Sequence, residues 1–233
     1  PVMQEQGFEL MLTPVDYLEQ TTAEALTEEF DGMIYYASNT NSNYDLLFEL
    51  ASQGFPVVTL DKALHEFSFP AVLADNFEGG QLATEHLLAQ GHQRIGYIFG
   101  ERHHPQSVRQ RYLGYVDQLK KQQSSFRTKL DDPQALLSSA VSYIQENQLT
   151  GAVCENDLVA IELMRQLKQV GVQVPKEFAV IGFDDIQAAA LVDPPLSTVK
   201  QNFAELGRLA GTKLVQLIQS NTADLSTLAK EDE

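Results

Sequence analysis

Along the 233 residues, short continuous apolar runs alternate with longer stretches in which apolar residues recur every three or four positions. A short continuous apolar run is typical of a strand buried on both faces, and the wider spacing is typical of an amphipathic helix. Strands that alternate with helices in this way usually form parallel sheets covered by helices on both faces. The pattern therefore predicts an α/β protein built from doubly wound parallel sheets.

The clearest unit of this kind covers residues 151–185. Residues 152–154 form an apolar strand, Asn156 is suited to cap the helix that follows, and residues 178–182 form a second apolar strand. A right-handed crossover between two parallel strands brings both carboxyl ends to one edge of the sheet. Asn156 and Asp184 are thus predicted to emerge together, at the edge where open α/β sheets bind ligands.

The same two patterns, continuous apolar runs and apolar residues at every third or fourth position, predict the remaining elements. Further strands are predicted at residues 8–13, 32–36, 57–60, 71–73 and 95–99, with an extended segment at 196–201. Helices are predicted at residues 44–53, 78–90, from the low 100s to about 122, at 135–148 and at 202–218, with a weak helical period at 15–29 and a helical turn at 188–192. Residues 123–133 are polar and show no clear strand, and the polar tail 222–233 is expected to fray.

Charge and cysteine content limit the classes of function. The formal net charge is -16, whereas proteins that grip a phosphate backbone do so with lysine and arginine. Any nucleic-acid partner would therefore need another segment. The single cysteine, Cys154, excludes an internal disulfide framework and a multi-cysteine zinc site. No apolar run approaches the roughly 20 residues of a membrane helix, so we expect a cytoplasmic protein without a membrane partner.

Motifs for catalysis, cofactors and metals are weak. Gly79-Gly80 lies in no phosphate-binding pattern and is better explained by close helix packing. His103-His104 lacks neighbouring ligands at metal-site spacing. Cys154 has no evident base, and the acidic pairs are too scattered for glycosidase chemistry. We therefore predict no enzymatic activity, no cofactor and no metal.

Five segments together carry a family resemblance. They are LATEHLLAQGHQRIGYI (82–98), RYLGY (111–115), ENDLVAIELMRQL (155–167), VPKEFAVIGFDDI (174–186) and DPPLSTVKQNFAELGRLA (193–210). In this order and at these spacings they resemble the effector-binding domain of the LacI/GalR family of bacterial transcription regulators. The similarity spans most of the chain, and the five segments are specific together although none would be alone.

The resemblance implies the type I periplasmic-binding-protein architecture. Two similar α/β subdomains would be joined by crossing strands near Asp75 and Gln201, with a ligand cleft between them. Residues 1–74 plus 201–221 would form one subdomain, residues 75–200 the other, and residues 222–233 a polar tail. The family's helix-turn-helix, its first strand, a strand between residues 122 and 135 and its closing strand are not recognisable in these residues. We expect the DNA-binding module, of a type that the sequence does not fix, to lie outside this chain.

The resemblance also implies a ligand site. Arg111, in RYLGY, would hydrogen-bond the effector, although a surface helix arginine is the simpler interpretation. Asp184 would accept from effector hydroxyls or a ring nitrogen, Asn156 would supply an amide, and Gln201 would reach the ligand from the crossing strand. Asp184 and Asn156 are also suited to a turn and to a helix cap. Asp75 is a further candidate that could serve only to shape the hinge.

The function implied is that of a repressor's sensor. A small effector, a sugar or sugar phosphate and less readily a purine, would shift the relation of the subdomains and so control operator DNA through a homodimer. Residues 188–191 and 44–50 are candidate dimer segments. The alternative is a periplasmic sugar-binding protein of a transporter, which an upstream secretion signal would distinguish. An enzyme on this fold lacks a paired nucleophile and base.

Overall fold

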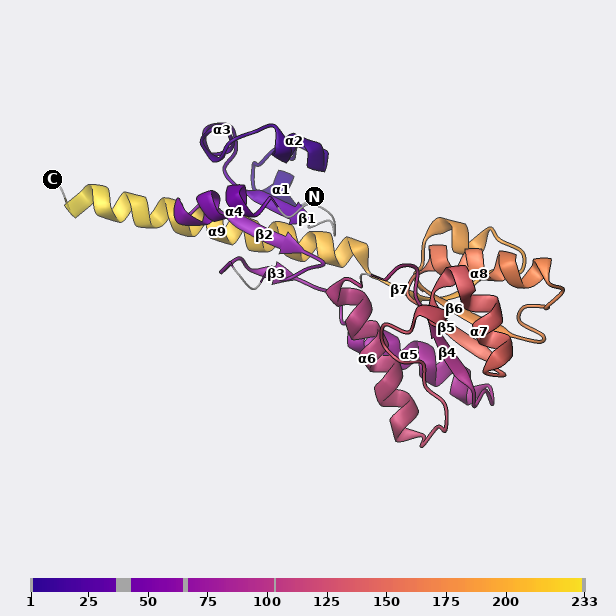
Figure 1. Ribbon diagram of the computed structural model, residues 1–233. Helices are drawn as coiled ribbons and strands as arrows, with labels where there is room; N and C mark the ends of the chain where they lie inside the picture. The colour runs from indigo at the N-terminus through magenta and orange to yellow at the C-terminus, as the bar shows by residue number, and fades with distance from the viewer. Residues whose placement is uncertain (1, 37–42, 65–66, 103, 232–233) are drawn as a thin grey trace. The chain divides into compact units, whose positions relative to one another are not determined.

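The computed structural model describes residues 2–36, 43–64, 67–102 and 104–231 (Figure 1). The chain divides into two compact units. Unit one comprises residues 1–74 and 202–233, and unit two comprises residues 75–201. The second boundary therefore lies one residue later than expected. Gln201 belongs to unit two, where its side chain bonds to Asp184.

Unit one contains a parallel three-stranded sheet in the order β1-β2-β3. The strands are β1 (Met33–Tyr36), β2 (Val57–Leu60) and β3 (Ala71–Val72). The helices are α1 (Val2–Glu5), α2 (Val15–Glu19), α3 (Ala23–Glu29), α4 (Tyr44–Ser52) and α9 (Phe203–Glu231). Figure 1 shows α9 running alongside this sheet, where it contacts all three strands.

The two faces of this small sheet have separate apolar clusters. Successive strand residues point to opposite faces, and β2 shows this directly. Val57 packs with Leu47 and Leu50 of α4, whereas Val58 packs with Ala210 and Leu214 of α9. The continuous apolar run at β2 therefore reflects burial on both faces, as the sequence pattern predicts.

Unit two contains a parallel four-stranded sheet in the order β4-β5-β6-β7. The strands are β4 (Ile95–Ile98), β5 (Gly151–Cys154), β6 (Ala179–Asp184) and β7 (Ser197–Lys200). The helices are α5 (Asn76–Ala89), α6 (Gln106–Lys121), α7 (Ala140–Glu146) and α8 (Asp157–Gln169), with 3₁₀ turns η1 (Pro133–Ala135), η2 (Leu137–Ser139) and η3 (Gln187–Ala190). The predicted fold class and the β5-α8-β6 unit are confirmed.

Helices cover both faces of the four-stranded sheet. A side chain at Gly151 would contact Leu87 of α5, and one at Gly182 would collide with Asp157 of α8. These two glycines face opposite sides, because Gly151 is in register with Ala179 and Gly182 lies three residues further along β6. The sheet is therefore a middle layer between α5 and α8.

The glycines of α5 and α6 allow these helices to pack closely. A Cβ at Gly80 would collide with the backbone carbonyl of Arg111, and one at Gly114 with the backbone carbonyl of Phe77. A Cβ at Gly79 would lie 2.5 Å from the ring of Phe183. The prediction that Gly79-Gly80 serves helix packing is therefore confirmed.

The strand predicted at residues 8–13 is wrong. The segment has no regular structure, and Leu10, Met11 and Leu12 are 69%, 59% and 95% exposed. An apolar run becomes a strand only where a neighbouring strand can satisfy its backbone groups. Among the described residues, β1 pairs with β2 and no strand pairs with residues 8–13.

The helix predicted at residues 135–148 is half wrong. Only Ala140–Glu146 is α-helical, because backbone groups of the residues before it form hydrogen bonds with Phe99 instead of with one another. Phe99 N–H donates to the carbonyl of Ala135, and Leu137 N–H donates to the carbonyl of Phe99. This single bridge stands where the resemblance led us to expect a strand.

The tail also differs from expectation, since α9 continues to Glu231 instead of fraying after residue 221. No glycine or proline follows Gly211 to stop the helix.

Candidate functional site

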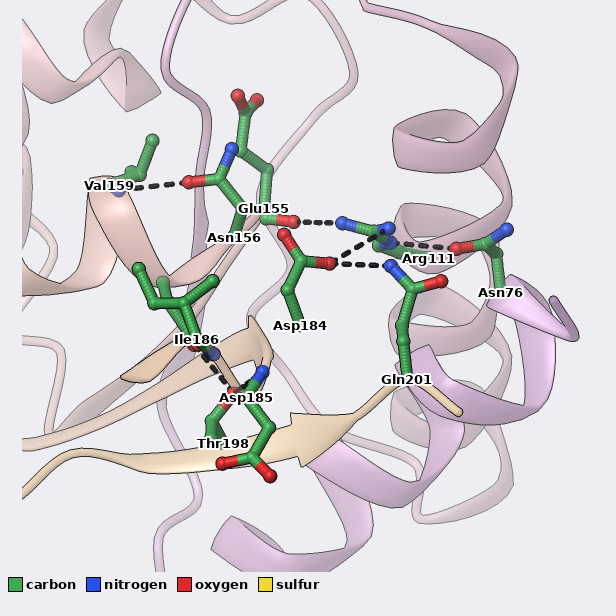
Figure 2. A network of polar contacts seen from close by, with 11 residues as sticks. Asn76, Arg111, Glu155, Asn156, Val159, Asp184, Asp185, Ile186, Thr198 and Gln201 are labelled. Carbon is green, nitrogen blue, oxygen red and sulfur yellow. Dashed lines mark hydrogen bonds and ion pairs between the residues drawn. The ribbon is translucent and has the colours of Figure 1, made fainter. Parts of the chain in front are cut away.

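Polar side chains converge at the carboxyl edge of the four-stranded sheet (Figure 2). Glu155 follows β5, Asp184 ends β6, and Gln201 follows β7. Asn76 begins α5, and Arg111 reaches the same place from the second turn of α6. These five residues are called the Arg111 cluster below. The topology accounts for their meeting, because the carboxyl ends of parallel strands share one edge.

Arg111 is the centre of the cluster and is 5% exposed. Its Nε donates to Asn76 Oδ1 at 2.8 Å, and Nη1 donates to the carbonyl of Glu155 at 2.6 Å. Nη2 lies 3.3 Å from Asp184 Oδ1. One face of the guanidinium lies 3.8 Å from the ring centroid of Phe183, a cation–π contact. The interpretation of Arg111 as a solvated surface residue is therefore wrong.

Asp184 is held in a turn of unusual backbone conformation. Its φ is 111°, and that of Asp185 is 57°, values that aspartate tolerates better than most residues because its side chain bonds to nearby backbone. Figure 2 shows one oxygen of its carboxylate, Oδ1, facing both Arg111 and Gln201, and Gln201 Nε2 donates to this oxygen at 2.6 Å. The Asp184 side chain is 23% exposed. The carboxylate is thus fixed on one side and open to solvent on another.

Gln201 has an unsatisfied acceptor. The residue is 9% exposed, and within the described part of the chain its buried Oε1 has no hydrogen-bond partner. Leaving a buried carbonyl unpaired costs about 1–3 kcal/mol. A group bound at this edge that donates a hydrogen bond, such as a hydroxyl, would remove that cost.

Asn156 and Asp75 both cap helices. Asn156 Oδ1 accepts from Val159 N–H at 2.9 Å at the start of α8, and Asp75 Oδ1 accepts from Glu78 N–H at 2.9 Å at the start of α5. Capping, the simpler interpretation of Asn156, is confirmed, and its ligand role stays a prediction because the Nδ2 group remains available for a second contact. For Asp75 the ligand role likewise stays a prediction.

Asp157 has a positioning role that the sequence reasoning missed. Its carboxylate is 1% exposed and accepts from Ile186 N–H at 2.8 Å and from the Thr198 hydroxyl at 2.5 Å. Thr198 Oγ1 also accepts from Asp185 N–H at 3.4 Å. Asp157 therefore ties α8 and β7 to the turn that presents Asp184. In the sequence, Asp157 is an acidic residue directly after the helix cap Asn156. That position alone indicates only a favourable interaction with the helix dipole.

Glu155 and Asn76, both partners of Arg111, were missed as well. A side chain at Gly100 would lie 2.6 Å from Glu155 Oε1, so the absence of a side chain there leaves room for the carboxyl group. Burial raises the pKa of Glu155, while a hydrogen bond from Gly100 N–H and the charge of Arg111 oppose the shift. Glu101 and Asp184 raise this pKa further. Glu155 thus meets Arg111 through its backbone carbonyl, while Figure 2 shows its carboxylate directed away from the guanidinium.

The other chemical candidates have structural roles. Cys154 is fully buried, and burial raises the pKa of its thiol, which disfavours the reactive thiolate. His104 stacks on Phe99 with ring centroids 4.2 Å apart, and His103 lies outside the described residues. The described residues contain no group of three or more His, Cys, Asp or Glu side chains arranged to hold a metal. Within the same residues, each helix is too short or too polar to cross a membrane.

Comparison with known proteins places this geometry in a family. Residues 84–229 match the model of the periplasmic binding protein-like domain. The chain belongs to this family. Among curated relatives it is 29% identical over 221 residues to the ribose operon repressor of Haemophilus influenzae and 27% identical over 247 residues to the arabinose metabolism transcriptional repressor of Geobacillus stearothermophilus.

The structural comparison agrees. A LacI family transcriptional regulator from Enterococcus faecium, solved with bound ribose, is 29% identical and superposes with a TM-score of 0.74, covering 94% of this chain and 82% of that chain. The resemblance to LacI/GalR regulators is therefore confirmed. The two curated repressors align with 92% and 95% of this chain, which spans 65% of the length of each.

Proposed function

We propose that this chain is the effector-sensing domain of a bacterial transcription repressor and that a small sugar binds at the Arg111 cluster. The observation that carries the proposal is the contact of the partly exposed Asp184 carboxylate with the buried Arg111 and Gln201, together with the unsatisfied Gln201 Oε1 at an edge of the kind that binds ligands in open α/β sheets. Asn156 and Asp75 are proposed as peripheral contacts. The names of the similar proteins support a pentose, since two refer to ribose and one to arabinose.

The chemistry of the cluster suits a polyhydroxylated ligand. A sugar hydroxyl both donates and accepts hydrogen bonds. Asp184 and Gln201 Oε1 offer acceptors, and Arg111 has N–H groups beyond the three in the contacts described. A site that pairs buried polar groups with substrate hydroxyls discriminates strongly against analogues that lack them.

Regulation would follow from a shift between conformations. A ligand that binds one state better biases the equilibrium toward it, and in a homodimer this resets the spacing of two DNA-binding heads. We propose such a dimer, with residues 188–191 and 44–50 as contact segments. Leu191 and Phe48 are 78% and 67% exposed, as an unpartnered interface would require. Operator DNA would be bound by a module outside this chain, in the cytoplasm. The inter-subdomain cleft stays a prediction.

The alternatives have less support. The similar proteins named above are repressors or regulators, which favours a regulator over a periplasmic sugar-binding protein and over an enzyme. We therefore propose that the chain has no catalytic activity and requires no cofactor or metal.

A thermal-shift screen tests the proposal. The purified chain is heated with ribose, arabinose, hexoses, disaccharides, sugar phosphates and purines. A ligand present at 100 times its dissociation constant adds about 2.7 kcal/mol of stability. We expect a pentose to raise the melting temperature and Gln201→Met to abolish the rise.

A matched control separates binding from folding. Gln145 is exposed on α7, and Gln145→Met should leave the ligand-dependent rise unchanged. If no compound stabilises the folded wild-type chain, or if Gln201→Met retains the full rise, the proposed site is wrong.

A further inference from the structure

Asn76 is a buried polar residue whose amide oxygen contacts a neighbouring helix. It is the first residue of α5 and is 6% exposed. The start of this helix is already capped, because Asp75 Oδ1 accepts from Glu78 N–H. Asn76 Oδ1 instead accepts from Arg111 Nε–H at 2.8 Å, and Figure 2 shows this oxygen facing the guanidinium. The Asn76 oxygen therefore supports Arg111 of α6, not the start of its own helix.

Close packing of α5 and α6 brings these two side chains together. Residues four positions apart on a helix lie on the same face, so Asn76 and Gly80 both face α6. A Cβ at Gly80 would collide with the backbone carbonyl of Arg111. Gly80 thus meets the backbone of Arg111, and Asn76 meets its side chain. The contact belongs to the helix pair and forms without a ligand.

Three fixed contacts set the orientation of the Arg111 guanidinium. A guanidinium is planar and carries its five N–H donors in a rigid fork, so few contacts determine where all of them point. Phe183 fixes the plane, since the guanidinium carbon lies 3.8 Å from its ring centroid. Asn76 Oδ1 fixes the direction of Nε–H, and the Glu155 carbonyl accepts from Nη1 at 2.6 Å. Together they direct the N–H groups of the terminal nitrogens that are left for a ligand.

The contacts that hold Arg111 in place are neutral. The amide of Asn76 and the backbone carbonyl of Glu155 carry no charge, whereas Asp184, at 3.3 Å from Nη2, is a charged partner. The Asp184 side chain is 23% exposed and is itself proposed to contact the ligand. Asn76 therefore orients the guanidinium without cancelling its charge, and charged donors form the stronger hydrogen bonds.

The geometry points to Asn76 as a positioning residue for sugar binding, whose amide oxygen holds Arg111 so that the remaining N–H groups face the ligand hydroxyls. This inference rests on the proposed function and deepens it. A long side chain that is not held in place must be ordered when the ligand binds, and that ordering weakens the affinity. Asn76 supplies the order before the ligand arrives.

Substitutions at Asn76 separate positioning from space filling. Asn76→Leu keeps the position filled and removes the acceptor, whereas Asn76→Asp keeps an acceptor oxygen in a side chain of the same shape. Aspartate is also favoured in the first turn of a helix. A packing role predicts that leucine is tolerated and aspartate is not, and a positioning role predicts the reverse. Asn76→Ala removes the same acceptor without adding bulk, so it replaces Asn76→Leu if that variant does not fold.

NMR of the ligand-free chain measures how firmly Arg111 is held. In the wild type the Arg111 Nε–H is buried and bonded to Asn76, so it should exchange slowly with water. Asn76→Asp should retain this protection. In Asn76→Leu and Asn76→Ala the Nε–H should exchange at least about tenfold faster, because its acceptor is gone.

Calorimetric titration with ribose and with arabinose measures the effect on binding. Asn76→Leu should weaken the affinity for the sugar that the wild type binds by about tenfold or more, and Asn76→Asp should stay within about threefold of wild type. Asn147→Leu is the matched control. Asn147 is half-buried, donates from Nδ2 to the Tyr143 carbonyl, and lies before β5, at the opposite edge of the sheet from the cluster. This control should leave the sugar affinity unchanged.

The outcomes separate this inference from the proposed function. Wild-type affinity in Asn76→Leu or Asn76→Ala overturns the positioning role alone, as do equal losses in Asn76→Leu and Asn76→Asp or an equal loss in Asn147→Leu. Unchanged Nε–H exchange in the variants without the acceptor overturns it as well. If the folded wild-type chain binds no sugar, the proposed sensor function fails, and the role of Asn76 in sugar binding fails with it.

Discussion

Asp157 determines the conformation of the turn that presents Asp184, although its carboxylate is itself buried. It accepts from one backbone N–H in the turn and from the Thr198 hydroxyl on β7. Removing a buried acceptor leaves its donors unsatisfied, which costs more than the net strength of the bonds. At the residue scale, therefore, the site depends on residues beyond those expected to touch a ligand.

A double-mutant cycle measures this dependence. Asp157→Ala should lower the free energy of unfolding by about 2–4 kcal/mol, and Thr198→Val by about 1 kcal/mol. Because the two side chains bond to each other, the double variant should lose less than the sum, with a coupling energy of about 1 kcal/mol or more. Urea denaturation gives all four values, and strictly additive losses would show that the bond contributes nothing.

Glu155 gives a pH-dependent prediction. Its pKa is raised on folding, chiefly by burial, so the folded state binds its proton more tightly than the unfolded state does. The stability associated with that proton is fully present below the ordinary glutamate pKa and is lost as pH rises through the folded pKa.

Glu155→Gln removes this loss, so the variant should gain stability relative to wild type as pH rises above the ordinary glutamate pKa of about 4.3, by up to about 1.4 kcal/mol per pH unit until the folded pKa is passed. Paired urea titrations at several pH values measure the difference. A stability difference that stays constant with pH would mean that the carboxyl group titrates normally in the folded protein.

At the scale of elements, the periodicity of the sequence predicted most of the sheet and helix order and failed where tertiary contacts decide. The run at residues 8–13 has strand composition but no strand partner among the described residues. Residues 135–139 have helical spacing, but their backbone bonds to Phe99 instead. A short stretch of sequence does not show whether its backbone will find such a partner, because pairing depends on how segments distant in the chain pack.

The same limit applies to the site. Arg111, Asp184 and Gln201 were predicted from a motif resemblance, and they meet in the structure. Asn76 and Glu155 were missed because their contact with Arg111 depends on how α6 packs against α5 and the strand ends. Periodicity identifies the buried face of α6 but not which residue on a neighbouring helix Arg111 will meet.

Close packing of α5 and α6 is thus a condition for the site. Gly80→Ala should separate these helices, because the new Cβ collides with the Arg111 carbonyl, and we expect a loss of about 2 kcal/mol or more in unfolding free energy together with weaker ligand binding. A Cβ at Gly207 in α9 would meet no heavy atom within 4 Å among the described residues, so Gly207→Ala should instead stabilise by about 0.5–1 kcal/mol. Equal effects of the two substitutions on thermal stability would contradict this explanation.

At the scale of the whole molecule, every residue of the Arg111 cluster belongs to unit two, which is a single continuous stretch of chain. Unit one is assembled from two stretches, residues 1–74 and 202–233. The chain leaves unit two directly after Gln201, the residue whose amide bonds to Asp184. A ligand that engages Gln201 therefore acts where the chain passes from one unit into the other, which is where a sensor needs to couple binding to conformation.

Side-chain NMR tests most directly whether a neutral sugar binds at the Arg111 cluster. Titration of the labelled chain with the pentose identified by thermal shift should move the Gln201 amide and Arg111 Nε–H resonances, because both groups lie within the cluster. A separate groove on unit two, lined in part by Ile161, Met164 and Val192, offers a comparison region. Shifts confined to that groove, with Gln201 and Arg111 unchanged at saturating ligand, would contradict sugar binding at the cluster.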